Sequence, residues 1–140
     1  MGQPQSDTRN EQGLQSMLET FAKAFTQGDG KTAATCWEVP ALIVADQGSK
    51  AVATLEEVED FFGGAAQQYK DMGVTGTRPE IQSATWLTDR LVSVHVRWPY
   101  LDAKGQARPE SEASTYVMRI GDDGRPRITV VVMMGASKGG

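Results

Sequence analysis

The feature that most constrains the fold is a stretch of alternating hydrophobicity that runs from Leu91 to Met134. Within Leu91–Tyr100, valine, tryptophan and tyrosine occupy the even positions, while serine, histidine and arginine occupy most of the odd ones. Successive side chains of a β-strand point to opposite faces of its sheet, so this pattern predicts a strand with one buried face. The segments Glu110–Ile120 and Arg127–Met134 also alternate, and we expect three antiparallel strands.

Two turn sequences between these strands predict how they pair. The segment Asp102–Gly105 fits a type I turn whose final glycine forms a bulge, and a second turn is expected at Asp122–Gly124. Under the resulting register, the even-numbered residues of all three strands share one face of the sheet. The pairs that follow are Val96 with Glu112, Pro99 with Pro109, Ile120 with Ile128 and Ser114 with Met134.

Length, charge and cysteine content bound the class of protein. The 140 residues suffice for one domain with a real core, which we expect over residues 8–135 with flexible ends at 1–7 and 136–140. A net charge of −4 without a basic cluster argues against nucleic-acid binding, and the apolar runs are too short to cross a membrane. The single cysteine, Cys36, excludes an internal disulfide. We therefore expect a cytoplasmic protein that uses neither a metal nor another cofactor.

Helical signals come before the strands. Leu14, Leu18, Phe21 and Phe25 recur at helical spacing and predict an amphipathic helix from about Thr8 to Gln27. The later elements are a short helix over Gly30–Cys36 capped by Asp29, a hairpin of Leu42–Asp46 and Lys50–Ala53, a helix opened by the capping box Thr54–Glu57 and ending near Met72, and a strand over Glu80–Leu87.

This order of elements, together with Trp37-Glu38-Val39-Pro40 and the Asp-Gly turn before Ile128, resembles the nuclear transport factor 2-like (SnoaL-like, cystatin-like α+β) superfamily. The resemblance implies an α+β fold in which a cone-shaped, curved, mainly antiparallel sheet wraps around the three helices and encloses a pocket. Members of the superfamily include ketosteroid isomerases, polyketide cyclases, scytalone dehydratases and epoxide hydrolases, and many others only bind a ligand or mediate association. A shared fold does not by itself transfer an activity.

Glu112 is the most informative candidate residue because the predicted register turns it toward the apolar inner face. A carboxylate there is either a catalytic acid or base, or the ion-pair partner of Arg108 or Arg78. In the catalytic interpretation, Ser114 or Tyr116 would hydrogen-bond the oxygen on which charge develops. The expected ligand-binding residues, which are equally compatible with an ordinary core, are Trp37, Tyr69, Trp98, Tyr100, Met118 and Met134.

Other reactive side chains are less suited to catalysis. The His–Asp pair and the Asp–Arg–Asp set used by enzymes of the superfamily would need His95 or Arg97 inside the cone, and both have outward parity. Cys36 has no base close to it in the sequence and is interpreted as an inert buried thiol.

The odd-numbered face of the sheet predicts an interface. Val117, Val131 and Met133 would lie on this outer face, and we expect it to form a two-fold homodimer. Two functional hypotheses follow. The first is a small-molecule-binding domain with an apolar pocket, whose enzymatic form would be an acid/base lyase, isomerase or cyclase acting on a small carbonyl compound. The second is a non-catalytic dimeric association module whose pocket is filled by its own side chains.

Overall fold

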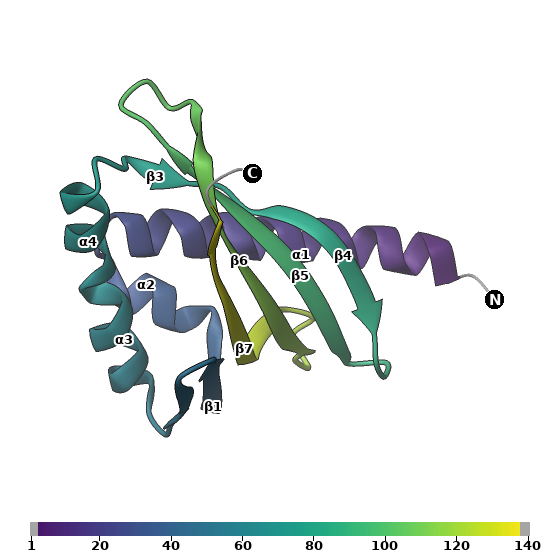
Figure 1. The fold of residues 1–140 in the computed structure, drawn as a ribbon. Helices are drawn as coiled ribbons and strands as arrows, with labels where there is room; N and C mark the ends of the chain where they lie inside the picture. The colour runs from purple at the N-terminus through teal and green to yellow at the C-terminus, as the bar shows by residue number, and fades with distance from the viewer. Residues whose placement is uncertain (1–2, 138–140) are drawn as a thin grey trace.

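The computed structural model, which describes residues 3–137, has its helices packed on one face of a strongly curved sheet (Figure 1). The helices are α1 (Gln3–Thr26), α2 (Gly30–Thr35), α3 (Leu55–Gly63) and α4 (Ala65–Asp71). The strands are β1 (Trp37–Ala45), β2 (Gly48–Val52), β3 (Gly76–Thr77), β4 (Glu80–Trp86), β5 (Leu91–Leu101), β6 (Ala107–Ile120) and β7 (Pro126–Ser137). The predicted α+β class with a curved sheet is confirmed.

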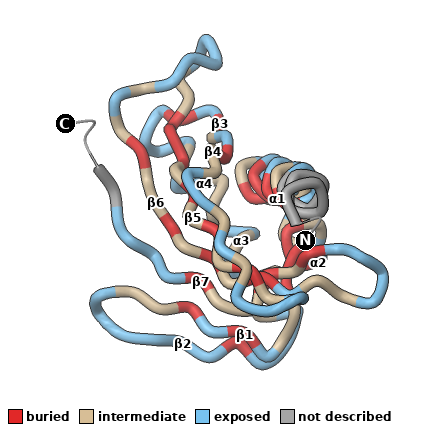
Figure 2. Tube along the Cα trace, turned by 90° about the vertical axis from the view of Figure 1, so that its right-hand side faces the viewer, coloured by how far each residue is buried: buried red, intermediate tan, exposed pale blue. Residues whose placement is uncertain are grey.

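The seven strands form one mixed sheet with the order β2-β1-β7-β6-β5-β3, and β4 also pairs with β5. The β1–β7 pair is parallel and the other pairs are antiparallel. Figure 2 places the buried stretches of the sheet and of α1 toward one another, with the exposed loops outside. Among the described residues, no helix is long and apolar enough to span a bilayer.

The first two helices follow from their sequence signals. Gly28 adopts a φ of +74°, which favours glycine, directly after the end of α1. The Asp29 carboxylate then accepts a hydrogen bond from the Thr32 amide at 3.1 Å and caps α2. Helix α1 starts at Gln3, earlier than the expected Thr8, so part of the predicted flexible N-terminal segment is helical. Residues 1–2 and 138–140, also predicted to be flexible, lie outside the described residues.

The single helix expected from Thr54 to Met72 is broken into α3 and α4 at Gly64. Its predicted cap is present: the Glu57 amide donates to the Thr54 hydroxyl at 3.2 Å, and the Ala53 amide donates to the Glu57 carboxylate at 3.2 Å. Glycine is the weakest helix former after proline, so two in succession favour a break. The two short helices form one side of the interior (Figure 1).

The first hairpin differs from the prediction at both ends. Strand β1 starts at Trp37 and contains Pro40, which was expected to end the preceding helix. The β1–β7 pairing shifts register between Trp37 and Leu42, which accommodates a residue without an amide hydrogen inside a strand. Ala45 pairs with Gly48, so the hairpin loop is shorter than the predicted turn.

The turn between β5 and β6 has the predicted form, but the register beyond it does not. The Asp102 amide donates to the Gln106 carbonyl at 2.8 Å. Beyond it the pairing shifts between Pro99 and Leu101, and Pro99 lies opposite Ser111 instead of Pro109. The extra β6 residues include Pro109, which cannot donate to the ladder. Because the shift is an even number of residues, the pairs become Trp98 with Glu112 and Val96 with Ser114, and the predicted inner face is preserved.

The β6–β7 pairing shifts twice, and each shift reverses the face of the β7 residues that follow. Met118 pairs with Ile128, whereas Tyr116 pairs with Val131 and Ser114 with Met133. The predicted pairs Ile120–Ile128 and Ser114–Met134 are therefore wrong. Val131 and Met133 face the interior instead of the outer face, and Met134, predicted to line the pocket, is 56% exposed.

Candidate functional site

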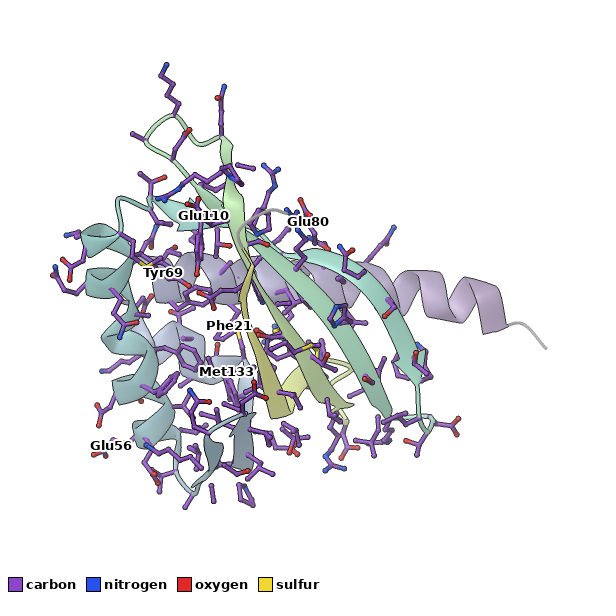
Figure 3. All side chains as sticks on the ribbon, viewed as in Figure 1. Phe21, Glu56, Tyr69, Glu80, Glu110 and Met133 are labelled. Carbon is purple, nitrogen blue, oxygen red and sulfur yellow. The ribbon has the colours of Figure 1, made fainter. Side chains whose placement is uncertain are left out.

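A cavity of about 370 Å³ lies between the helices and the concave face of the sheet. Phe21 of α1, Tyr69 of α4 and Met133 of β7 line it from three elements, and all three are labelled in Figure 3. Half of the lining residues that the structure describes are aromatic, and these are Phe21, Phe25, Trp37, Phe61, Phe62, Tyr69, Trp98 and Tyr116. The others are Ile43, Ala65, Gln68, Met72, Glu112, Ser114, Val131 and Met133.

The aromatic wall is organised around the Phe21 ring. Its centroid lies 5.0 Å from those of Phe25 and Phe62, and 6.4 Å from that of Trp98, each in an edge-to-face arrangement. Such arrangements bring the positive edge of one ring to the negative face of the next and fix the rings relative to one another. The cavity therefore has rigid, preformed walls on this side.

Among the lining residues that the structure describes, Glu112 is the only carboxylate, and none is a lysine, arginine or histidine. The Tyr100 hydroxyl donates a hydrogen bond of 2.5 Å to Glu112 Oε1. The two arginines expected as ion-pair partners lie elsewhere: Arg108 donates to Glu110 at 3.0 Å and to the Met72 carbonyl at 2.9 Å. Arg78 lies 3.6 Å from Glu80. A neutral phenol thus takes the place predicted for an arginine.

The two cavity-lining tyrosines remain protonated near neutral pH. Burial raises the pKa of Tyr116, and the Glu112 charge raises it further against the lowering effect of hydrogen bonds from Ser114 and Trp98. The Trp98 Nε1 donor lies 3.1 Å from the Tyr116 oxygen. Burial, followed by the Glu112 charge, also raises the pKa of Tyr69. The phenols contribute hydrogen-bonding groups but no charge.

The structure brings together most of the residues predicted to form the site. Those at the cavity are Trp37, Tyr69, Trp98, Glu112, Ser114 and Tyr116. Tyr100 does not line the cavity but holds Glu112 through its hydroxyl. Met118, predicted to bind the ligand, is fully buried in the core and does not line the cavity. Met134 lies on the outer face, where its sulfur is 3.3 Å from the Thr115 hydroxyl.

The reasoning from sequence missed several lining residues. Val131 and Met133 were assigned to the other face because the β7 register shifts were not foreseen. Phe61 and Met72 lie at the cavity on the two halves of the broken helix, and the Gly63–Gly64 pair was the available signal for that break.

The remaining reactive side chains lie away from the cavity. His95 is 3.0 Å from the Thr115 hydroxyl, and Arg97 pairs with Glu80 at 2.8 Å, both outside the cone as predicted. Cys36 is buried, and burial raises the pKa of its thiol. Among the described residues, no three histidine, cysteine, aspartate or glutamate side chains gather closely enough to hold a metal ion.

Comparison with known proteins identifies one family and many similar folds. The model of a family described as NTF2-like protein (DUF6841) matches residues 10–136. No curated protein matches the sequence. A domain of unknown function with a cystatin-like fold from Nostoc punctiforme is 19% identical, with 91% of this chain and 78% of that chain covered and a TM-score of 0.66.

Two further solved structures share the fold. An NTF2-like protein of unknown function from Shewanella oneidensis is 17% identical, with 89% of this chain and 98% of that chain covered and a TM-score of 0.64. A ketosteroid isomerase-like protein from Erwinia carotovora is 12% identical, with 86% and 91% covered and a TM-score of 0.59. At these identities the likeness concerns the fold alone.

Proposed function

The chain belongs to the NTF2-like family DUF6841, and from that premise we propose that it binds a small, largely apolar molecule in its cavity. The observation that carries this proposal is the aromatic cavity of about 370 Å³. Ligand sites are commonly concave, roughly 300–1,000 Å³ in volume, and apolar except for a few placed polar groups. Glu112, Ser114 and Gln68 are such groups here. The open volume supports this hypothesis over the alternative of a pocket filled by the protein's own side chains.

The test uses N-phenyl-1-naphthylamine, an uncharged dye whose fluorescence rises in apolar surroundings. We expect saturable binding to the wild-type protein. Ala65→Phe places a ring at a lining position and should weaken binding by about tenfold or more. Gln67→Phe adds the same ring at an exposed, non-lining position of α4 and should leave binding unchanged.

The binding proposal is wrong if the wild-type protein does not bind the dye, or if the two phenylalanine variants bind it equally. Circular dichroism and thermal unfolding of both variants establish that Ala65→Phe acts by filling the cavity and not by unfolding the protein.

The enzymatic form of the proposal assigns acid/base chemistry to Glu112. The Tyr100 hydroxyl positions this carboxylate beside the cavity, and Ser114 and Tyr116 supply buried hydroxyls that line the same cavity. A base at this position would remove the α-proton of a bound ketone, which NMR detects as exchange for deuterium. We expect Glu112→Gln to keep dye binding and to abolish any exchange that the wild type accelerates. Absence of accelerated exchange in the wild type over a panel of small ketones contradicts catalysis and leaves the binding function intact.

We also propose a homodimer through the outer sheet face. The observation in its favour is a group of exposed apolar side chains on neighbouring strands, namely Leu42 (38% exposed), Val132 (38%) and Met134 (56%), beside Val117. These replace Val131 and Met133 in the predicted interface. We expect Val132→Asp to produce monomers in analytical ultracentrifugation, whereas Leu87→Asp, at an exposed position outside this group, should not. A wild-type monomer at high micromolar concentration would exclude the dimer.

A further inference from the structure

The charge around the cavity is of one sign. Glu112 contributes a carboxylate, and no cationic side chain is found among the lining residues in the described part of the chain. From this asymmetry we propose that the ligand is an organic cation, an amine or quaternary ammonium group carried on an apolar body. The proposal rests on the cavity being a ligand site and names the chemical class that this site selects.

The first step is that Glu112 lacks a cationic partner within the described part of the chain. Its hydrogen bond comes from the neutral Tyr100 hydroxyl at 2.5 Å. Of the two arginines on the same strand, Arg108 is occupied by Glu110 and by the Met72 carbonyl, and Arg119 by Glu38. A carboxylate that is partly withdrawn from water without a counter-charge is unfavourable, and a bound cation removes this penalty.

The second step is that the field of Glu112 extends into the cavity. Its charge contributes to raising the pKa of both Tyr69, on α4, and Tyr116, on β6, although burial is the larger cause for each. Both phenols therefore stay neutral and neither adds to nor cancels the charge. An anionic ligand would be repelled by the uncompensated carboxylate, and a neutral ligand would leave it without a counter-charge.

The third step is the aromatic surface next to the carboxylate. Trp98 lies directly opposite Glu112 in the β5–β6 ladder, so their side chains are neighbours on the concave face. Tyr69 lines the same cavity from α4. Aromatic rings attract cations, most strongly where water is excluded, and they also accept an apolar body. The corner formed by Glu112, Trp98 and Tyr69 therefore combines both kinds of recognition.

The donor set favours an organic over a metallic cation. Ca²⁺ and Mg²⁺ require several oxygen ligands, of which carboxylates are the main protein source. Within the described residues, Glu112 belongs to no group of three potential ligands. One carboxylate surrounded by rings suits an ammonium group, which needs a single charged acceptor and benefits from π contacts.

The test compares three ligands with one carbon skeleton and different charge: 4-phenylbutylamine, 4-phenylbutanol and 4-phenylbutyrate. Isothermal titration calorimetry at neutral pH should give an affinity for the amine about tenfold or more above that for the alcohol, because a charge-assisted hydrogen bond adds to the same apolar contacts. The anionic ligand, 4-phenylbutyrate, should bind most weakly of the three. This comparison uses the wild-type protein alone and needs no variant to fold.

Two glutamine variants of equal charge locate the effect. Glu112→Gln should abolish the preference for the amine while keeping the affinity for the alcohol, since the amide oxygen still accepts from Tyr100. Glu56→Gln, at an exposed position in the first turn of α3 (Figure 3), should keep the wild-type preference.

The outcomes separate this inference from the proposed function. Equal affinity of the wild type for the amine and the alcohol, or a preference for the amine that survives Glu112→Gln, overturns the cation inference and leaves the binding function intact. If neither these ligands nor N-phenyl-1-naphthylamine binds, both proposals are overturned.

Discussion

The two ends of the interior are built from different side chains. At one end, aliphatic and thioether groups of α1, β5, β6 and β7 are completely shielded from solvent, and they include Leu14, Leu18, Val92, Val94, Met118 and Ile128. At the other end, aromatic rings from α1, α3, α4 and the sheet surround a cavity of about 370 Å³. We name these the aliphatic end and the aromatic end.

The difference shows how one core can be both stable and hollow. Branched and flexible side chains can interdigitate to the density of an organic crystal, and the six named residues of the aliphatic end are fully buried and do not line the cavity. At the aromatic end, edge-to-face contacts orient the rings relative to one another around the cavity, and the break at Gly64 divides the helix that lines it. We expect stability to depend mainly on the aliphatic end and ligand binding on the aromatic end.

The largest expected effect compares a truncation at each end. Leu18→Ala should lower the free energy of unfolding by about 2–5 kcal/mol, because it leaves a cavity in a fully packed region. Met133→Ala removes a 38% exposed side chain that already borders empty space, and it should cost less than about 1 kcal/mol. Urea unfolding followed by circular dichroism measures both. Equal losses in the free energy of unfolding would contradict the claim that stability depends mainly on the aliphatic end.

A second comparison uses two glycines and concerns the wall of the aromatic end. A Cβ at Gly30 would lie 2.3 Å from the Glu59 carbonyl oxygen, so Gly30→Ala should push α2 and α3 apart and cost about 1–3 kcal/mol. It should also weaken dye binding, because α3 lines the cavity through Phe61 and Phe62.

The matched control is Gly13→Ala in α1, where a Cβ meets nothing within 4 Å. It should stabilise the protein by about 0.5–1 kcal/mol through helix propensity and leave dye binding unchanged. Destabilisation by both substitutions would show that the close approach of α2 and α3 is not the cause.

The smallest expected effect concerns pH and the turn between β6 and β7. A hydrogen bond from Arg127 is the main reason that the pKa of Asp123 falls from 3.8 to about 2. A depressed pKa in the folded state contributes stability that is present above pH 3.8 and is lost as the pH falls toward about 2. Asp123→Asn should therefore flatten the acid dependence of the unfolding midpoint in that window.

Asp123→Asn also serves as a control for ligand binding at the aromatic end, because the turn that contains Asp123 does not line the cavity. Dye binding at neutral pH should be unaffected by Asp123→Asn. Arg127→Gln removes the other member of the pair and should flatten the same acid window. An unchanged acid profile in both variants would contradict the assigned role of the pair.

Regular alternation explains which parts of the fold were predictable. Strand β5 keeps one face buried along its whole length, and its even-numbered residues face inward as expected. The β5–β6 register was wrong by two residues, but an even error preserves the face, and Glu112 was correctly directed toward the interior. The resemblance to the nuclear transport factor 2-like superfamily was likewise confirmed.

Register shifts within strands explain why the buried face of some residues was predicted wrongly. A one-residue shift between Ile128 and Val130 of β7 reversed the faces of Val131, Met133 and Met134, and no residue in that valine-rich segment marks where this shift occurs. A shift in β4 similarly lets Ile81 and Trp86, which have opposite parity, both pack against the core. The volume of the cavity depends on the spacing between the helices and the sheet, and the hydrophobic pattern within each element does not determine that spacing. The aromatic residues were predictable as interior, but the space between them was not.

The most direct test of the hollow aromatic end is a crystal structure under xenon pressure. Xenon enters apolar cavities without requiring a particular ligand chemistry. We expect xenon density in the cavity lined by Phe62, Trp98 and Tyr116, and none between Leu18 and Met118. Absence of xenon from the cavity, with Phe62 of α3 in direct contact with Tyr116 of β6 across it, would show that the aromatic end is not hollow.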